Sequence, residues 1–197
     1  MISRSRFFSA NDGKCCLLSR LKRLRKFVLV IAIGIVAYWG CLYWREHRFD
    51  SDIAEAARRY DLDPALVRAV IWQESRFDPD ARGRAGELGL MQIRDAAAME
   101  WANAEHIQSF DHADCLDPAT NVLAGAFYLK RVSRHYSRAD DPIPYALAEY
   151  NAGRGNVLKW LNGSAATNSA AFIGQIGFPG TKAYVLAILD RRDYYHR

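Results

Sequence analysis

The 197-residue sequence is poor in the residues that build disulfides and metal sites. It has four cysteines and five histidines, and no pair of them has the spacing of metal ligands. Cys115 is the only cysteine after residue 50, so that part of the chain has no partner for an internal disulfide. We therefore expect no metal site and no cofactor.

Strand-like alternation of apolar and polar residues is also missing, and no internal repeat is visible. Apolar residues recur at helical spacing instead, which predicts an all-α (mainly α) fold after residue 50. We expect helices over 53–60, 64–74, 95–104, 118–136, 144–150, 155–161 and 181–192, with loops over 76–90 and 162–180.

Positive charge is scarce outside the N-terminal quarter. The net charge is +5, but residues 1–50 hold 10 Lys and Arg against 3 Asp and Glu, which leaves 17 against 19 for the rest. A nucleic-acid groove needs basic residues clustered on the folded domain. The near-neutral remainder argues against a nucleic-acid partner.

Charge is absent from Phe27 to Trp44, and these 18 residues would span about 27 Å as a helix, enough for a bilayer core. Aromatic residues gather at its far end, as at a membrane interface, and the basic residues before it predict a cytoplasmic N-terminus. We expect a cytoplasmic basic segment (1–26), one transmembrane signal anchor (27–44), a polar stalk (45–50) and an outer domain (51–197).

Two alternatives to an uncleaved anchor remain open. One is a cleaved signal, although no small-x-small cleavage site follows the apolar run. The other is a lipoprotein anchored at Cys41 after Gly40. Tyr38 and Trp39 match poorly the small or aliphatic residues that usually stand before such a cysteine.

The helix expected over 64–74 carries the carboxylate of greatest interest. Its apolar stripe of Val67, Val70 and Ile71 continues to Glu74, seven positions after Val67. Burial on this side would disfavour the charged form and raise the pKa of Glu74. A carboxyl group that stays protonated near neutral pH suits a general acid. In the alternative, Glu74 turns to solvent or pairs with a neighbouring arginine.

Three short motifs, each modest alone, are specific in their order and spacing: WQES at 72–75, GLMQI at 89–93 and AEYNAG at 148–153. Together they resemble the lysozyme-like domain of the soluble-type (SLT) lytic transglycosylases, which cleave bacterial peptidoglycan. The resemblance runs from about Ile53 to Tyr195. It includes the linking helix after Asp117 and a closing motif that contains Thr181 and Tyr184.

The resemblance implies a helical lysozyme-like fold with a substrate groove. It also implies cleavage of the β-1,4 bond between N-acetylmuramic acid and N-acetylglucosamine, with a 1,6-anhydromuramoyl product. Glu74 matches the catalytic glutamate. The substrate-binding residues it implies are Ser75, Met91, Gln92, Tyr150, Asn151 and Tyr184.

Several of these roles have alternatives. Ser75 could satisfy backbone groups, Met91 could be plain core, and Tyr184 could serve packing alone. Tyr150 is expected to hold the Glu74 carboxyl through its hydroxyl, and Asn151 to bind substrate or hold its loop.

The sequence departs from the family pattern at several positions, and three of them concern a carboxylate gained or lost. Gly180 replaces a usual Glu in the closing motif. Glu149 stands where Ala is common, and could either raise the pKa of Glu74 or face solvent. Glu87 stands where the family usually has a small residue. We expect Glu87 to be a solvated loop carboxylate, but in the groove it would make hydrolysis possible.

The implied protein is an enzyme of the bacterial inner membrane, with its catalytic domain in the periplasm or outside. Its expected partners are glycan strands, the membrane and possible cell-wall or secretion-machinery proteins. The competing hypotheses are a goose-type hydrolytic lysozyme, a non-catalytic glycan-binding module and an assembly factor for a secretion apparatus.

Overall fold

The computed structural model describes residues 10–197, with side chains from residue 23 onward. The first nine residues of the predicted cytoplasmic segment, among them Arg4 and Arg6, lie outside this range. The described chain divides into two units, one up to Arg45 and one from Glu46 to the C-terminus.

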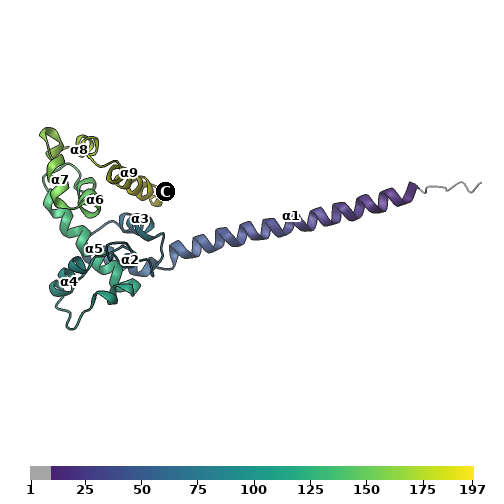
Figure 1. Cartoon of the computed structure of the whole chain (residues 1–197), viewed down its shortest axis with the longest axis horizontal. Helices are drawn as coiled ribbons and strands as arrows, with labels where there is room; N and C mark the ends of the chain where they lie inside the picture. The colour runs from purple at the N-terminus through teal and green to yellow at the C-terminus, as the bar shows by residue number, and fades with distance from the viewer. Residues whose placement is uncertain (1–9) are drawn as a thin grey trace, which may run out of the picture. The chain divides into compact units, whose positions relative to one another are not determined.

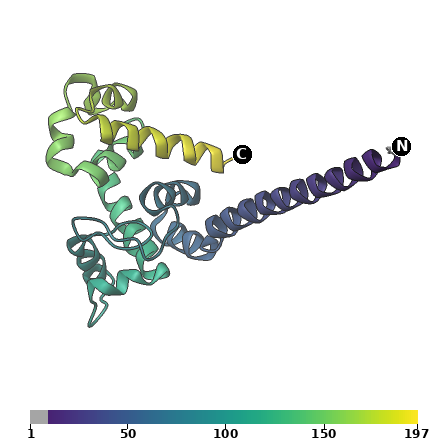
Figure 2. The same ribbon diagram turned by 45° about the vertical axis from the view of Figure 1, so that its right-hand side comes forward.

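The described part of the N-terminal unit is helical and belongs to α1 (Ala10–His47), drawn in purple to blue in Figures 1 and 2. The last two residues of α1 belong to the second unit. An 18-residue window of α1 has a mean hydropathy of 2.1, and none of this window is buried in the structure. By length and composition α1 could cross a membrane. Cys41 lies exposed on it.

The second unit contains eight α-helices within the described residues. Their bounds are α2 Asp50–Tyr60, α3 Pro64–Ser75, α4 Asp95–Ala104, α5 Pro118–Ser133, α6 Ile143–Ala152, α7 Arg154–Trp160, α8 Ser169–Gln175 and α9 Pro179–Tyr195. Short 3₁₀ helices cover His112–Leu116, Arg134–Tyr136 and Gly163–Ala166. Residues 10–197 contain no strand, only isolated bridges at Leu88. The prediction of an all-α fold is confirmed.

The stalk expected over 45–50 is mostly helical, and its side chains bind within the second unit. The Glu46 carboxylate accepts a hydrogen bond of 2.6 Å from Arg191 in α9. Asp50, the first residue of α2, accepts one of 2.7 Å from Arg68 in α3. Both ion pairs lie within the second unit and join residues 46–50 to α9 and α3.

The loop prediction over 162–180 is wrong, because this segment contains a 3₁₀ helix and α8. Asn168 caps α8 by accepting a hydrogen bond of 2.8 Å from the Ala171 amide. Phe172 is fully buried and stacks on Tyr145, with ring centroids 4.1 Å apart. A helix of seven residues is marginal on its own and too short to show periodicity. The Asn168 cap and the contact of Phe172 with Tyr145 stabilise α8.

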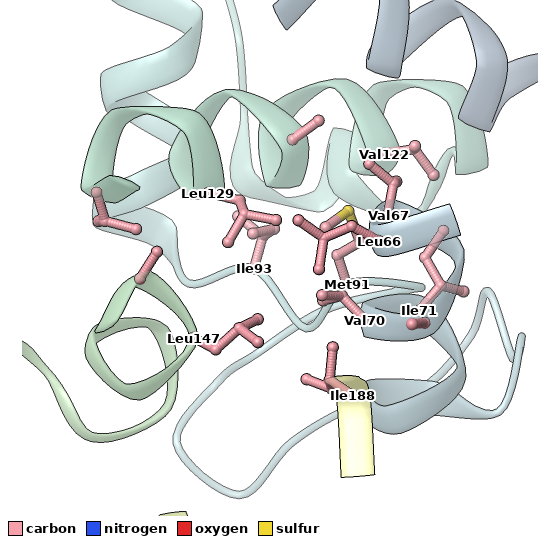
Figure 3. Close-up of a cluster of buried hydrophobic side chains, with 14 of the residues drawn as sticks. Leu66, Val67, Val70, Ile71, Met91, Ile93, Val122, Leu129, Leu147 and Ile188 are labelled. Atoms are coloured by element: carbon pink, nitrogen blue, oxygen red, sulfur yellow. The ribbon is translucent and has the colours of Figure 1, made fainter. Parts of the chain in front are cut away.

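The core forms where α3 packs against α9 and α2 against α5, while α6 contacts both α5 and α9. Figure 3 shows the apolar side chains of α3, α5, α6 and α9 converging with Met91 and Ile93 of the loop that follows α3. This packing fixes the C-terminal end of α3, which carries Glu74.

Candidate active site

Glu74 lies in the last turn of α3. The helix begins at a well-formed cap, where Asp63 accepts a hydrogen bond of 2.9 Å from the Ala65 amide and Pro64 takes the first helical position. It ends where Arg76 adopts a left-handed φ of 53°. The position of Glu74 is therefore set by helix geometry at both ends.

Burial raises the pKa of Glu74 to about 7. The hydrogen bond from Tyr184 works against this rise, and the negative charge of Glu87 adds to it. Near neutral pH the protonated and the ionised forms of Glu74 are present in comparable amounts, so the group can both give and take a proton.

The hydroxyl that holds Glu74 belongs to Tyr184, not to Tyr150 as predicted. Tyr184 in α9 donates to Glu74 Oε1 over 2.6 Å, across 110 positions of sequence. Tyr150 in α6 donates instead to the carbonyl oxygen of Met91, at 2.8 Å. Tyr184 therefore orients the Glu74 carboxyl, and Tyr150 holds the loop that contains Met91.

Glu74 opens onto a cleft of about 400 Å³ whose walls come from α3, α4, α5, α6 and the loop between α3 and α4. Its lining residues are Glu74, Glu87, Gln92, Ile93, Arg94, Ala97, Tyr128, Glu149, Tyr150, Asn151, Ala152 and Gly153. Of the predicted site residues, Gln92, Tyr150 and Asn151 share this cleft with Glu74.

Ser75 and Met91, the other predicted site residues of the first two motifs, contact the protein interior and not the cleft. Ser75 Oγ lies 2.8 Å from the carbonyl oxygen of Leu90 and donates to it, which matches the backbone alternative for this residue. Met91 is fully buried and points into the core in Figure 3, so its predicted contact with a sugar face is wrong. Its side chain anchors the loop from beneath.

Asn121 of α5 organises that loop, and sequence reasoning missed it. Its amide nitrogen donates to the carbonyl oxygens of Leu88 and Cys115, at 2.8 and 2.7 Å, and its oxygen accepts from the Met91 amide at 2.7 Å. Gly89 has a φ of +70°, and a Cβ there would lie 2.3 Å from Asn121 Nδ2. The available signal was a fully buried polar residue on the apolar side of its helix.

Gln92 closes the loop in a strained left-handed conformation, with a φ of 49°. Its side-chain amide donates to the carbonyl oxygens of Ala81 and Gly89, at 3.1 and 2.9 Å. Asn151 belongs to the third motif, in α6. Its amide oxygen accepts a hydrogen bond of 2.7 Å from the Thr181 hydroxyl of α9. Both amides therefore stand at fixed positions along the cleft.

Two further carboxylates line the cleft. Glu149 is 3% exposed and accepts from the Tyr136 hydroxyl at 2.5 Å, with His135 Nδ1 at 3.1 Å. It is thus held by the 3₁₀ helix Arg134–Tyr136 that follows α5, rather than turned to solvent. Glu87, expected to be a solvated loop residue, keeps 21% of its side chain exposed and pairs with Arg94. It also lines the cleft, which is the alternative that would make hydrolysis possible.

Among the described residues, no group of three or more His, Cys, Asp or Glu side chains is placed to hold a metal ion. The chemistry available in the cleft is that of carboxylates, tyrosine hydroxyls and amides.

A helical fold with a protonatable glutamate at the wall of an open cleft defines a lysozyme-like domain. Residues 51–173 match the model of the transglycosylase SLT domain, and the chain belongs to this family.

The chain is similar to the soluble lytic murein transglycosylase of Escherichia coli K12, with 31% identity over 156 residues, which is 76% of this chain and 24% of that protein. It is 36% identical over 119 residues to membrane-bound lytic murein transglycosylase F of Desulfosudis oleivorans, covering 59% of this chain and 24% of that protein.

Among solved structures, an inactive mutant of the lytic transglycosylase Slt from Pseudomonas aeruginosa matches with a TM-score of 0.66 and 29% identity. The match covers 74% of this chain and 23% of that one. The chain thus spans about a quarter of the length of these relatives.

Proposed function

We propose that this protein is a membrane-anchored peptidoglycan lytic transglycosylase. It cleaves the β-1,4 bond between N-acetylmuramic acid and N-acetylglucosamine and leaves a 1,6-anhydromuramoyl end. The observation that carries the proposal is Glu74, a carboxyl with a pKa of about 7 at the wall of the cleft. The SLT domain match and the names of the relatives support the same chemistry.

In this mechanism Glu74 acts twice. Its protonated form gives a proton to the glycosidic oxygen as the bond to C1 breaks, and the acetamido group of the substrate stabilises the cation. The resulting carboxylate then takes the proton of the muramoyl C6 hydroxyl, whose oxygen attacks C1 of its own ring. A pKa near 7 serves both steps, because neither protonation state is strongly favoured.

The neighbouring groups support Glu74 in different ways. Tyr184 orients its carboxyl through the hydrogen bond to Oε1. Gln92 presents its amide oxygen, and Asn151 its amide nitrogen, to the acetamido and hydroxyl groups of the glycan. Tyr150 lines the cleft, and its hydroxyl holds the loop through the Met91 carbonyl. Ser75 and Met91 act behind the cleft, through the loop that carries Gln92.

The first test is mass spectrometry of purified peptidoglycan digested by the full-length chain in detergent, beside Glu74→Gln. Because no water is consumed, we expect products about 18 Da lighter than reducing muropeptides, absent with the variant. Products with reducing ends from the wild-type chain would contradict the proposal. An absence of products from both proteins would favour a non-catalytic glycan-binding module.

Hydrolysis, as in a goose-type lysozyme, is the second candidate function, and the presence of Glu87 in the cleft is the observation that raises it. A second carboxylate could activate water for attack at C1. The hydrogen bonds that hold both Glu87 oxygens weigh against it.

We further propose that residues 27–44 of α1 anchor the protein in the inner membrane by a single pass, after the cytoplasmic segment 1–26. The domain 51–197 would then act in the periplasm on nearby glycan. The apolar, exposed surface of α1 and the membrane-bound relative support this. Protease added to spheroplasts should degrade the domain and spare an N-terminal fragment. A chain released by high salt without detergent would contradict the anchor.

A further inference from the structure

We propose that Glu87 is a positioning residue of this cleft: clamped by Arg94, its fixed negative charge holds the proton on Glu74 and does not activate water. This inference rests on the proposed function, since it explains how Glu74 serves both as acid and as base. It assigns a role to the carboxylate that departs from the family pattern.

Hydrogen bonds from the loop hold both oxygens of the Glu87 carboxylate. Oε1 accepts two hydrogen bonds from Arg94, from Nε at 2.9 Å and from Nη2 at 2.7 Å. Oε2 accepts one of 2.9 Å from the Ala85 amide. Gly83 leaves room for this arrangement, because a Cβ there would lie 2.2 Å from Glu87 Oε2.

This arrangement suits a fixed charge and not a general base. Arg94 and the loop amide hold the pKa of Glu87 below its ordinary value. A base that abstracts a proton from water works best with a pKa near the working pH, and its acceptor oxygen must face the water. With a donor on each oxygen and a lowered pKa, Glu87 remains an anion through the reaction.

The groups that face Glu74 from the packed elements separate into those that raise its pKa and those that lower it. Tyr184 of α9 lowers it by donating to the carboxylate, while Glu87 raises it by charge. The other titratable or charged side chains that line this cleft are Tyr128 of α5, Tyr150 and Glu149 of α6, and Arg94. Of the anions in the cleft, Glu87 is the one whose charge raises the pKa of Glu74.

The fixed charge would act at two moments of the proposed reaction. Before cleavage it keeps Glu74 protonated at neutral pH, ready to give its proton to the leaving oxygen. After cleavage it makes the ionised Glu74 a stronger base toward the C6 hydroxyl. Because the cationic sugar ring lies in a cleft that already holds this anion, the same charge also favours the transition state.

Glu87→Gln tests the inference, because the amide keeps the shape and one acceptor while it removes the charge. We expect the alkaline limb of the pH profile of kcat to move to lower pH. Activity above neutral pH should fall by about two- to five-fold, as a fraction of a pH unit implies. The anhydromuramoyl product should be unchanged. Glu87→Asp keeps the charge, so its alkaline limb should lie close to that of the wild type.

Glu55→Gln is the matched control. Glu55 pairs with Arg58 over 2.5 Å on the exposed face of α2, so the variant loses the same charge from the same kind of ion pair. An unchanged alkaline limb in Glu87→Gln, or an equal shift in Glu55→Gln, would overturn the inference. The wild type could also form some products with reducing ends. If Glu87→Gln lost only those products, the inference would be overturned, because Glu87 would then be a water-activating base.

A measurement without turnover separates this inference from the proposed function. The carboxyl ¹³C resonance of Glu74, identified by its loss in Glu74→Gln, can be titrated in the full-length labelled chain. Its midpoint should be lower in Glu87→Gln than in the wild type, whether or not glycan is cleaved. If the midpoint moves but no anhydro product forms, the proposed function fails alone. If products form and the midpoint does not move, the inference fails alone.

Discussion

The helical scaffold and the loop after α3 build the same cleft by different physical means. The scaffold of α3, α5, α6 and α9 places Glu74 by apolar packing (Figure 3). The loop over 76–94 has little regular structure, and its left-handed residues include Arg76, Phe77 and Gln92. Polar side chains from the helices hold it. The scaffold therefore raises the pKa of Glu74 by burial, and the loop supplies the charge of Glu87 and the amide of Gln92.

The largest expected effect comes from cutting the link between the two regions. Asn121→Ala leaves the buried Met91 amide and the Cys115 carbonyl without the partner that Asn121 supplies, and the Leu88 carbonyl keeps only the Ile93 amide. We therefore expect a loss of about 3–5 kcal/mol in unfolding free energy. Because the loop also loses its register, activity of the folded fraction should disappear. Thermal unfolding and turnover, measured on the same samples, test both statements.

Leu129→Ala is the control for that variant, because Leu129 is equally buried on the same helix α5. Its cavity should cost about 2–5 kcal/mol, yet the folded fraction should retain its activity. If the folded fraction of Asn121→Ala cleaves glycan as well as that of Leu129→Ala, the loop does not depend on Asn121.

The next effect concerns the scaffold alone. The pKa of Glu74 is raised from 4.5 to about 7 in the folded protein, so the folded state holds this proton more tightly than the unfolded chain. Stability linked to Glu74 is therefore present below about pH 4.5 and falls as the pH rises toward 7. Glu74→Gln removes this fall, so its unfolding free energy should exceed that of the wild type by about 3 kcal/mol above pH 8.

Unfolding of Glu74→Gln and the wild type, compared at pH 4 and pH 8.5, gives the measurement, since other titrations cancel in the difference. The variant should show little advantage at pH 4. An equal difference at both values would mean that the Glu74 carboxyl is not buried in its ionised form. The variant should have no activity at either pH.

A smaller effect is expected where scaffold and acid meet. Tyr184→Phe removes the hydrogen bond that lowers the pKa of Glu74, so the alkaline limb should move to higher pH, opposite to Glu87→Gln. Lost orientation should reduce turnover at the optimum by about tenfold, as one hydrogen bond implies. Tyr145→Phe loses a buried hydroxyl contact to Ala165 away from the cleft and should not shift the limb. A shift in both variants would point to a general loosening of the fold.

The smallest effect should follow Thr181→Val, which removes the hydroxyl that holds Asn151. We expect KM to rise by a few-fold with kcat nearly unchanged, because about 1 kcal/mol of orientation is lost on a substrate contact. Steady-state kinetics on soluble glycan fragments checks this. A fall in kcat alone would assign Asn151 to the chemical step.

Much of the scaffold was predictable because its signals are local. The cap and proline at Asp63 and Pro64 start α3, and the apolar stripe after them aims Glu74 at the core. The cap at Asp117 marks α5 in the same way. The segment 162–180 failed because α8 depends on the contact of Phe172 with Tyr145, 27 positions away, which no local window contains.

The site was less predictable than the fold. Glu74 came from helical spacing, but the choice of Tyr184 over Tyr150 as its hydrogen-bond donor depends on how α9 crosses α3. Met91 and Gln92 are adjacent in sequence, yet the backbone turn at Gln92 sends one side chain to the core and the other to the cleft. Motif letters cannot tell these two directions apart.

The sequence by itself determined the apolar run of α1, the helical class of the domain and the helix face on which Glu74 lies, because hydrophobic periodicity and end caps act over one or two turns. The tertiary structure alone decided the pKa of Glu74, the pairing of Glu87 with Arg94 and the hold of Asn121 on the loop. These depend on burial and on charges brought together from distant positions, and both arise only when the chain is packed.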